Sequence, residues 1–223
     1  MSRADLRRWA ADTWRSLDAM TAPGTGLPAD HLAASLAPAT RSRYTSPTII
    51  GGLLWSTVAA RELGLIGADE AVRRCRAVID NLAGMRVHHP SGMLYNWYDE
   101  ATGQRLDVLP DGGVVNQFLS SVDNGWLGAA LLVVRNAVPE MASDGERLLA
   151  RMDFGCFYDP AARLLYGGLW APDDASATPT GHHYGHLMSE PRIASYVGIA
   201  RGQIPPENTA RCRGSGASTT TGR

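Results

Sequence analysis

Polar side chains recur at three places where the sequence predicts that a helix begins. They are Thr45 and Ser46, Asp123 and Asn124, and Glu190 and Arg192. Carboxylate, amide and guanidinium groups hydrogen-bond sugar hydroxyls, and neighbouring Trp and Tyr rings pack against sugar C–H faces. If the three helix starts meet at one rim, they form a concave polar site that suits an uncharged polyhydroxyl ligand.

Amphipathic helices have to position these residues. In the first segment one helical face carries Leu6, Trp9, Thr13, Leu17 and Met20. The segment PGTGLP, residues 23–28, ends this helix.

The next helices begin at three serines. Ser46 is a plausible N-cap with Pro47 at the first helical position, Ser121 opens a helix to about residue 136, and Ser189 opens a third. These openings are 75 and 68 residues apart, and each is followed by a second helix or a loop. A period of this length predicts stacked α/α-hairpins, and therefore an all-α fold.

Aromatic, glycine-rich loops separate the predicted hairpins. Tyr98-Asp99 in the first loop matches Tyr158-Asp159 in the second, and Leu106 matches Leu164 or Leu165. Asp99 is expected to begin a turn, while Trp97 could either stack on a sugar ring or plug the hydrophobic interior. Trp126 leaves the same choice between a stacking role and a core role.

The composition excludes several classes of protein. Hydrophobic residues make up 44% and charged residues 19%, with a formal net charge of −1, so neither disorder nor binding to nucleic acid or an anionic membrane is expected. Three widely spaced cysteines suggest neither a disulfide framework nor a cysteine zinc site. The N-terminal segment has no apolar signal region, so a cytoplasmic location is expected unless an upstream signal has been lost.

Five ordered blocks resemble the glycoamylase-like family of glycoside hydrolases. They are TSPTIIGGLLWSTVAARELGLI (45–66), GMLYNWYDEATG (92–103), SSVDNGWLGAALLVVR (120–135), MDFGCFYD (152–159) and YGHLMSEPRIASYVGIARGQIP (184–205). That family includes endo-β-1,2-glucanases and has an (α/α)6 toroid, the six-hairpin glycosidase fold. The resemblance covers roughly residues 8–207 and implies about three of six hairpins.

The resemblance implies hydrolysis of glucosidic bonds in a glucan, without a cofactor. Such hydrolysis needs one carboxylic acid that protonates the leaving oxygen and a second group that activates water or acts as nucleophile. Glu190 is the expected acid and Asp123 the second carboxylate or a substrate ligand. Both could instead serve a helix start, through its dipole or as an N-cap. The expected substrate-binding residues are Asn124, Trp126, Asp99, Trp97, Tyr184, His186, Arg192, Thr45 and Ser46.

The sequence departs from the family at three places. Ile49 stands where the family usually has Asn, and Met188 where a polar residue is more usual. After residue 207 the family continues with further hairpins, whereas here a Ser/Thr/Gly/Arg-rich segment follows. We therefore expect an incomplete toroid domain over residues 1–207 and a disordered tail, which could be out of frame, over 208–223.

Two other interpretations remain open. His182, His186 and Glu190, with His183 adjacent, would line one face of a continuous helix and could bind zinc, but Gly181, Gly185 and Pro191 favour a loop, so no metal is expected. The domain could also be a non-catalytic carbohydrate-binding or inactive remnant, because half a toroid leaves one side of the site unbuilt. Exposed hairpin faces would then favour self-association.

Overall fold

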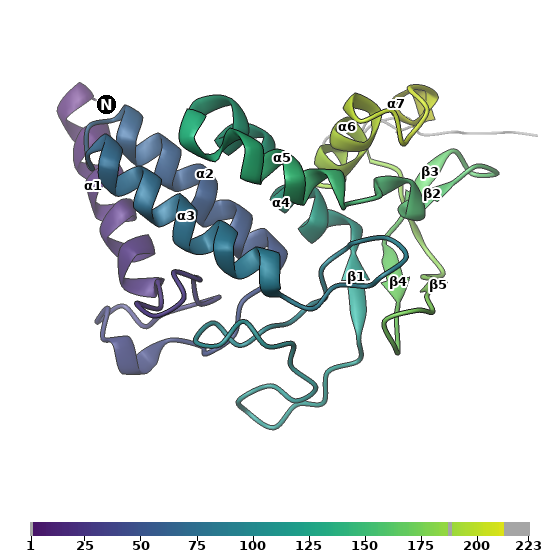
Figure 1. Ribbon diagram of the computed structural model, residues 1–223, viewed down its shortest axis with the longest axis horizontal. Coiled ribbons are helices and arrows are strands. Elements are labelled where there is room, and N and C mark those ends of the chain that lie inside the picture. The colour runs from purple at the N-terminus through teal and green to yellow at the C-terminus, as the bar shows by residue number, and fades with distance from the viewer. Residues whose placement is uncertain (1, 187–188, 212–223) are drawn as a thin grey trace, which may run out of the picture.

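The computed structural model describes residues 2–186 and 189–211, and within them the chain is mostly helical (Figure 1). The α-helices are α1 (Arg3–Met20), α2 (Pro47–Glu62), α3 (Ala68–Gly84), α4 (Ser121–Ala137), α5 (Ala142–Ala150), α6 (Arg192–Ala200) and α7 (Glu207–Arg211). The 3-10 helices are η1 (Pro38–Thr40), η2 (Pro139–Met141) and η3 (Phe154–Phe157). The strands are β1 (Phe118–Ser120), β2 (Tyr158–Asp159), β3 (Leu164–Tyr166), β4 (Gly168–Trp170), β5 (Thr178–Pro179) and β6 (His183–Tyr184).

Serine caps start the two central helices. The Ser46 hydroxyl accepts a hydrogen bond from Ile49 N, and Pro47 occupies the first position of α2, as predicted. Ser120 caps α4 by accepting from Asp123 N at 3.1 Å. Asp123 is therefore not the N-cap but an acidic residue in the first turn of α4.

The helices form two packed pairs around α2 and α4. α3 packs beside α2, α5 packs beside α4, and α6 packs on α4, while α2 and α4 make the most extensive helix–helix contact. Figure 1 shows α1 and α3 at one end of the molecule and α6, α7 and the strands at the other. The described residues thus contain two helical hairpins, α2–α3 and α4–α5, followed by α6 and the short α7.

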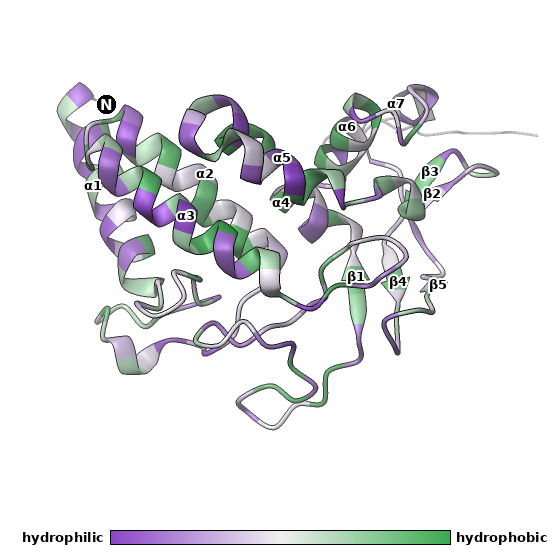
Figure 2. Ribbon diagram, in the orientation of Figure 1, coloured by the Kyte–Doolittle hydropathy of each residue, from purple (hydrophilic) through white to green (hydrophobic). Residues whose placement is uncertain are grey.

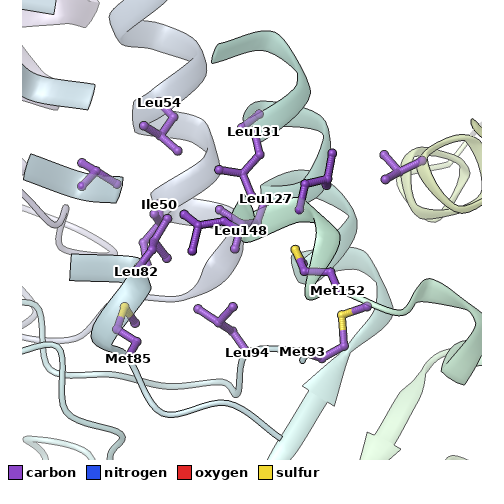
Figure 3. Packing of buried hydrophobic residues seen from close by; sticks show 14 of the residues in the cluster. Ile50, Leu54, Leu82, Met85, Met93, Leu94, Leu127, Leu131, Leu148 and Met152 are labelled. Atoms are coloured by element: carbon purple, nitrogen blue, oxygen red, sulfur yellow. The ribbon is translucent and has the colours of Figure 1, made fainter. Parts of the chain in front are cut away.

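One hydrophobic core joins these helices to the first loop. Figure 3 shows its side chains meeting between α2, α3, α4 and α5. The labelled members are Ile50, Leu54, Leu82, Met85, Met93, Leu94, Leu127, Leu131, Leu148 and Met152. Burial of this apolar surface is the main favourable contribution to folding.

The first helix is less buried than its pattern predicts. Leu6 is 47% exposed and Trp9 51% exposed, although both belong to the predicted apolar face. Figure 2 shows hydrophilic and hydrophobic residues mixed along α1 and α3, as expected of helices that lie on a surface.

Two small sheets correct the all-α prediction. β4 pairs antiparallel with both β1 and β5, and β3 pairs antiparallel with both β2 and β6. β2, β3 and the start of β4 fall in the second predicted aromatic loop, whereas β1, β5 and β6 lie outside both predicted loops. Short strands of this kind satisfy backbone groups of loops that cross the ends of the helices.

The predicted similarity between the two Tyr-Asp loops is confirmed, because each loop contains the same kind of turn. The Asp99 carboxylate accepts from the N–H groups of Ala101 and Thr102, each at 2.9 Å. Sixty residues later, the Asp159 carboxylate accepts from Ala161 N and Ala162 N at 2.8 and 3.2 Å. Asp99 therefore begins a turn, as expected.

The strand register changes one of the predicted matches. Tyr98 pairs with Arg105, and Tyr158 pairs with Leu165. Arg105 thus takes the place of Leu165, so Leu106 corresponds to Tyr166 and not to Leu164 or Leu165.

The C-terminal part differs from prediction in two ways. α6 begins at Arg192, because Ser189, Glu190 and Pro191 form a turn before it. The predicted tail is helical over its first residues, since α7 extends to Arg211 and the Asn208 amide donates to Arg163 O at 3.3 Å. Residues 212–223 and Met188 lie outside the described residues.

Candidate functional site

The N-terminal part of α4 packs directly against α2 on one side and against α6 on the other, because small residues stand where the helices cross. A Cβ atom on Gly51 of α2 would lie 2.9 Å from the Trp126 carbonyl oxygen and 3.0 Å from Leu127 N. A Cβ atom on Gly125 of α4 would lie 2.8 Å from Ala194 N in α6. The N-terminal ends of the three helices therefore lie side by side, as the predicted rim requires.

A groove of about 280 Å³ opens at these helix ends, and we call it the α2–α4–α6 groove. α2 supplies one wall, α4 supplies Trp126, and the turn before α6 supplies Glu190. α1 and the segment after it close the side with apolar groups. The lining residues are Leu17, Met20, Pro28, Thr48, Ile49, Gly52, Leu53, Ser56, Trp126 and Glu190.

Glu190 is exposed in the groove and fixed by its backbone. Its carbonyl oxygen accepts from Ile193 N at 3.0 Å, which ties the turn to the first residues of α6. Within residues 2–186 and 189–211 its carboxylate makes neither a hydrogen bond nor an ion pair. This carboxyl group is available to a ligand.

Trp126 brings an aromatic ring to the same groove. Its ring centroid lies 6.1 Å from that of Trp55, at an interplanar angle of 58°. The indole Nε1 is buried, with no acceptor among the described residues. Since buried donors are normally paired, this nitrogen marks a place where a bound molecule could complete the hydrogen bonding.

Asp123 lies one turn before Trp126 on α4. Residues three apart are neighbours on a helix surface, so the half-buried Asp123 stands next to the ring that lines the groove. Its carboxylate makes no hydrogen bond or ion pair within the described part of the chain. Asp123 does not itself line the groove.

Asn124 has a structural role, which corrects its predicted place among the substrate-binding residues. It is fully buried, and its Oδ1 accepts from Leu94 N at 2.9 Å. Its Nδ2 donates to Leu94 O and Ser120 O, each at 3.0 Å. The amide is thus occupied by the backbone of the first loop.

Thr45 and Ser46 are also buried inside the fold. Thr45 pairs through its backbone with Tyr98, at 2.8 and 3.0 Å, and Ser46 caps α2. The predicted rim therefore contains Thr48 and Ile49, one turn further on, in place of these two residues.

Asp99 and Trp97, in the first loop, make contacts within the fold and not in the groove. Asp99 closes its turn by also accepting from the Thr102 hydroxyl at 3.1 Å. The half-buried Trp97 ring meets Tyr44 edge to face, with centroids 5.2 Å apart. Neither residue lines the α2–α4–α6 groove.

The segment before α6 holds the remaining predicted residues. Half-buried Tyr184 lies in β6 and meets His182 edge to face at 5.5 Å, while exposed His186 accepts from the Ser189 hydroxyl through its carbonyl oxygen. The Arg192 guanidinium packs 4.7 Å above the Tyr196 ring and donates to its hydroxyl.

The helix needed for a zinc site is not formed. His183 and Tyr184 belong to β6, and the His183 Nε2 lies 2.7 Å from an Asp159 carboxylate oxygen. Among residues 2–186 and 189–211, no group of three His, Cys, Asp or Glu side chains could hold a metal ion.

Two features of the structure, one in the groove and one outside it, escaped the sequence reasoning. Thr48, Gly52 and Ser56 stand four residues apart on α2, and this stripe of small residues forms the floor of the groove. Helical spacing of small residues was the available signal. Glu100, next to Asp99, is buried, and burial raises the pKa of its carboxyl group.

The comparisons with known proteins address the fold and the family. A model described as a protein of unknown function, DUF3131, matches residues 8–179. The chain belongs to the DUF3131 family. A cyclic β-(1,2)-glucan synthase, NdvB of Rhizobium meliloti (strain 1021), is 32% identical over 139 residues, which are 62% of this DUF3131 chain and 4% of NdvB.

Three solved structures share the fold of this DUF3131 domain. A β-1,2-glucanase from Parabacteroides distasonis matches with a TM-score of 0.73 and 19% identity, over 95% of this chain and 30% of that chain. An endo-β-1,2-glucanase from Chitinophaga pinensis, in complex with sophorotriose and glucose, has a TM-score of 0.65 and 16% identity, over 94% of this chain and 50% of that chain. An endo-β-1,2-glucanase variant from Talaromyces funiculosus, in complex with β-1,2-glucan, has a TM-score of 0.66 and 10% identity, over 95% of this chain and 51% of that chain. The chain spans about half of these proteins or less.

This likeness confirms the predicted resemblance to the glycoamylase-like, six-hairpin glycosidases at the level of the fold. Helices in the described residues are too short or too polar to cross a membrane.

Proposed function

We propose that the α2–α4–α6 groove binds a β-1,2-linked glucan and that Glu190 acts there as the general acid in its hydrolysis. The observation that carries the proposal is that Glu190 and Trp126 line one groove at the starts of three adjacent helices. An aromatic face beside a carboxyl group is the combination that a sugar ring and its glycosidic oxygen require.

The choice of glucan rests on the relatives. The solved β-1,2-glucanases and the cyclic β-(1,2)-glucan synthase share this linkage in their names. In the proposed reaction Glu190 protonates the leaving oxygen, and Asp123 activates water or attacks the anomeric carbon. Trp126 would hold the sugar ring through its C–H face.

A second candidate is glucan binding without hydrolysis. Two observations favour it. Asp123 lies beside the groove and not in its lining, and the chain spans only 30 to 51% of the three matched structures. Either observation leaves room for a second catalytic group that this chain does not supply.

Two measurements distinguish the two candidate functions. The release of reducing ends from β-1,2-glucan measures hydrolysis, and calorimetry measures glucan binding. The proposal predicts turnover that falls by about 100-fold or more in Glu190→Gln and in Asp123→Asn, with glucan affinity retained, because loss of a positioned acid or base removes that much catalysis. Glu140→Gln, an exposed residue of η2, is the matched control and should keep wild-type turnover.

Each outcome decides between the candidates. Wild-type turnover in Glu190→Gln would remove the catalytic assignment. Tight binding by the wild-type protein without reducing-end release would establish the second candidate, and the lack of both would remove the glucan proposal.

A further inference from the structure

A tryptophan stands exposed on the small sheet that leads into α4. Trp170 lies on β4, the central strand, and is 46% exposed. Its partner on β1 is Phe118, and its partner on β5 is Thr178. Because partners across antiparallel strands share one face of the sheet, the three side chains form a row with the indole in the middle.

The indole is held in place by the sheet beneath it. The Phe118 ring centroid lies 4.9 Å from that of Trp170, with the planes tilted by 49°. Gly168, two residues before Trp170, faces the same side, and any Cβ there would overlap the Phe118 ring. Glycine therefore makes room for the Phe118 ring, which packs at a tilt against the exposed indole without covering it.

Uncharged polar groups surround this ring. A groove of about 370 Å³ is lined by Asn116, Gln117, Trp170, Pro172 and Thr178. The Gln117 amide is fixed, since its Nε2 donates to Leu106 O at 3.0 Å and to an Asp107 carboxylate oxygen at 2.7 Å. Its Oε1 is buried, with no donor among the described residues. A fixed acceptor without a donor suits a ligand that brings hydroxyl groups.

We propose that this groove, the Trp170 platform, is a second carbohydrate-binding subsite. An ordered indole offers a flat face to sugar C–H groups, and amide and hydroxyl side chains without formal charge match sugar hydroxyls. None of its lining residues lines the α2–α4–α6 groove.

The platform is connected to the candidate active site through the backbone. β1 ends at Ser120, which caps α4, and α4 carries Trp126 into the α2–α4–α6 groove. A glucan chain bound at both places would gain affinity from the second contact. The choice of a β-1,2-linked glucan as the ligand rests on the function proposed above, whereas the binding surface itself does not.

The test is fluorine NMR of the full chain labelled with 5-fluorotryptophan. The chain has six tryptophans, and the Trp170→Phe, Trp126→Phe and Trp9→Phe variants assign three of the resonances. On titration with β-1,2-linked gluco-oligosaccharides, the Trp170 resonance is expected to shift saturably. Trp9, which is 51% exposed on α1, is the internal control and should not shift.

The three resonances test the Trp170 platform independently of the function proposed for the α2–α4–α6 groove. Saturable shifts at Trp170, with or without shifts at Trp126, support the platform. A shift at Trp126 alone overturns the platform and leaves the proposed function in place. A shift at Trp170 alone supports the platform and overturns the α2–α4–α6 groove, and silence at both overturns both. Equal shifts at Trp9 would indicate non-specific binding and count against the platform.

Affinity measurements add a second readout. Trp170→Ala is expected to bind β-1,2-glucan about tenfold more weakly, which corresponds to the loss of one aromatic stacking contact. Trp170→Tyr keeps a stacking face and should retain most of the affinity, and Trp9→Ala should match the wild-type protein. Unchanged affinity in a folded Trp170→Ala protein would overturn the proposal.

Discussion

The two faces of α2 differ in how closely they are packed, although adjacent glycines, Gly51 and Gly52, stand on them. At Gly51 a Cβ would press on the backbone of Trp126 and Leu127 in α4. At Gly52 a Cβ would meet no atom of the described chain within 4 Å, because this residue faces the α2–α4–α6 groove. A rotation of about 100° per residue separates the two positions.

The difference shows that one helix serves two purposes. Its packed face fixes the distance between α2 and α4, and its open face keeps space for a ligand. A glycine on the packed face is required by a neighbouring backbone, whereas a glycine on the open face leaves space in the groove at a cost in helix stability.

Removing a side chain from the packed face should give the largest effect. Leu54 is fully buried between α2 and α4, so Leu54→Ala is expected to lower the free energy of unfolding by about 2–5 kcal/mol through lost burial and a residual cavity. Urea denaturation measures it. Leu63→Ala, 54% exposed at the end of α2, should change it by less than about 0.5 kcal/mol. Similar values for both would contradict the division of α2 into two faces.

Alanine substitutions at the two adjacent glycines should change the free energy of unfolding in opposite directions. Gly51→Ala should destabilise the fold by about 1–3 kcal/mol, because the new methyl group forces α4 away. Gly52→Ala should stabilise it by about 0.5–1 kcal/mol, because alanine favours the helix and meets open space. If both variants lose stability equally, the groove face is packed in solution. Gly52→Ala should also weaken glucan binding, since it narrows the groove.

An ion-pair contact at the surface between helices should contribute least to the free energy of unfolding. Glu146 of α5 binds Arg135 of α4 and Arg201 after α6, each at 2.6 Å, and these hydrogen bonds lower the pKa of the Glu146 carboxyl group. Its stabilisation is present above the unfolded pKa of about 4.3 and is lost as pH falls through the lower folded pKa. Glu146→Gln should lower the free energy of unfolding by less than about 1 kcal/mol at pH 7, because the three charged side chains are partly exposed to water.

The pH and salt dependence of unfolding check this third effect. The difference between Glu146→Gln and the wild-type protein should vanish at pH values where Glu146 is protonated, and it should shrink in high salt. A difference that persists in acid would mean that packing, and not charge, joins α5 to α4 and α6.

Local features of this fold were predictable because they depend on neighbours in the chain. The Ser46 cap, the start of α4 and the Asp99 turn follow from side chains that bond to backbone groups two or three residues away. The end of α1 and the repeat of the Tyr-Asp loops are of the same kind.

The roles of individual polar residues were less predictable. Asn124 was expected at a ligand, but its partners Leu94 N and O lie thirty residues away in the sequence, and no local pattern reveals them. Thr45 was likewise expected at the rim and is buried by its pairing with Tyr98. Trp170 was overlooked because its exposure depends on how three short strands pair.

The sequence by itself determined the main helices and the resemblance to six-hairpin glycosidases, and it proposed Glu190 and Trp126 as site residues. Only the tertiary structure decided which polar groups reach the groove and which are used inside the fold. The physical reason is that helix periodicity and capping are set by residues one turn apart, whereas burial and hydrogen-bond satisfaction depend on segments brought together from distant parts of the chain.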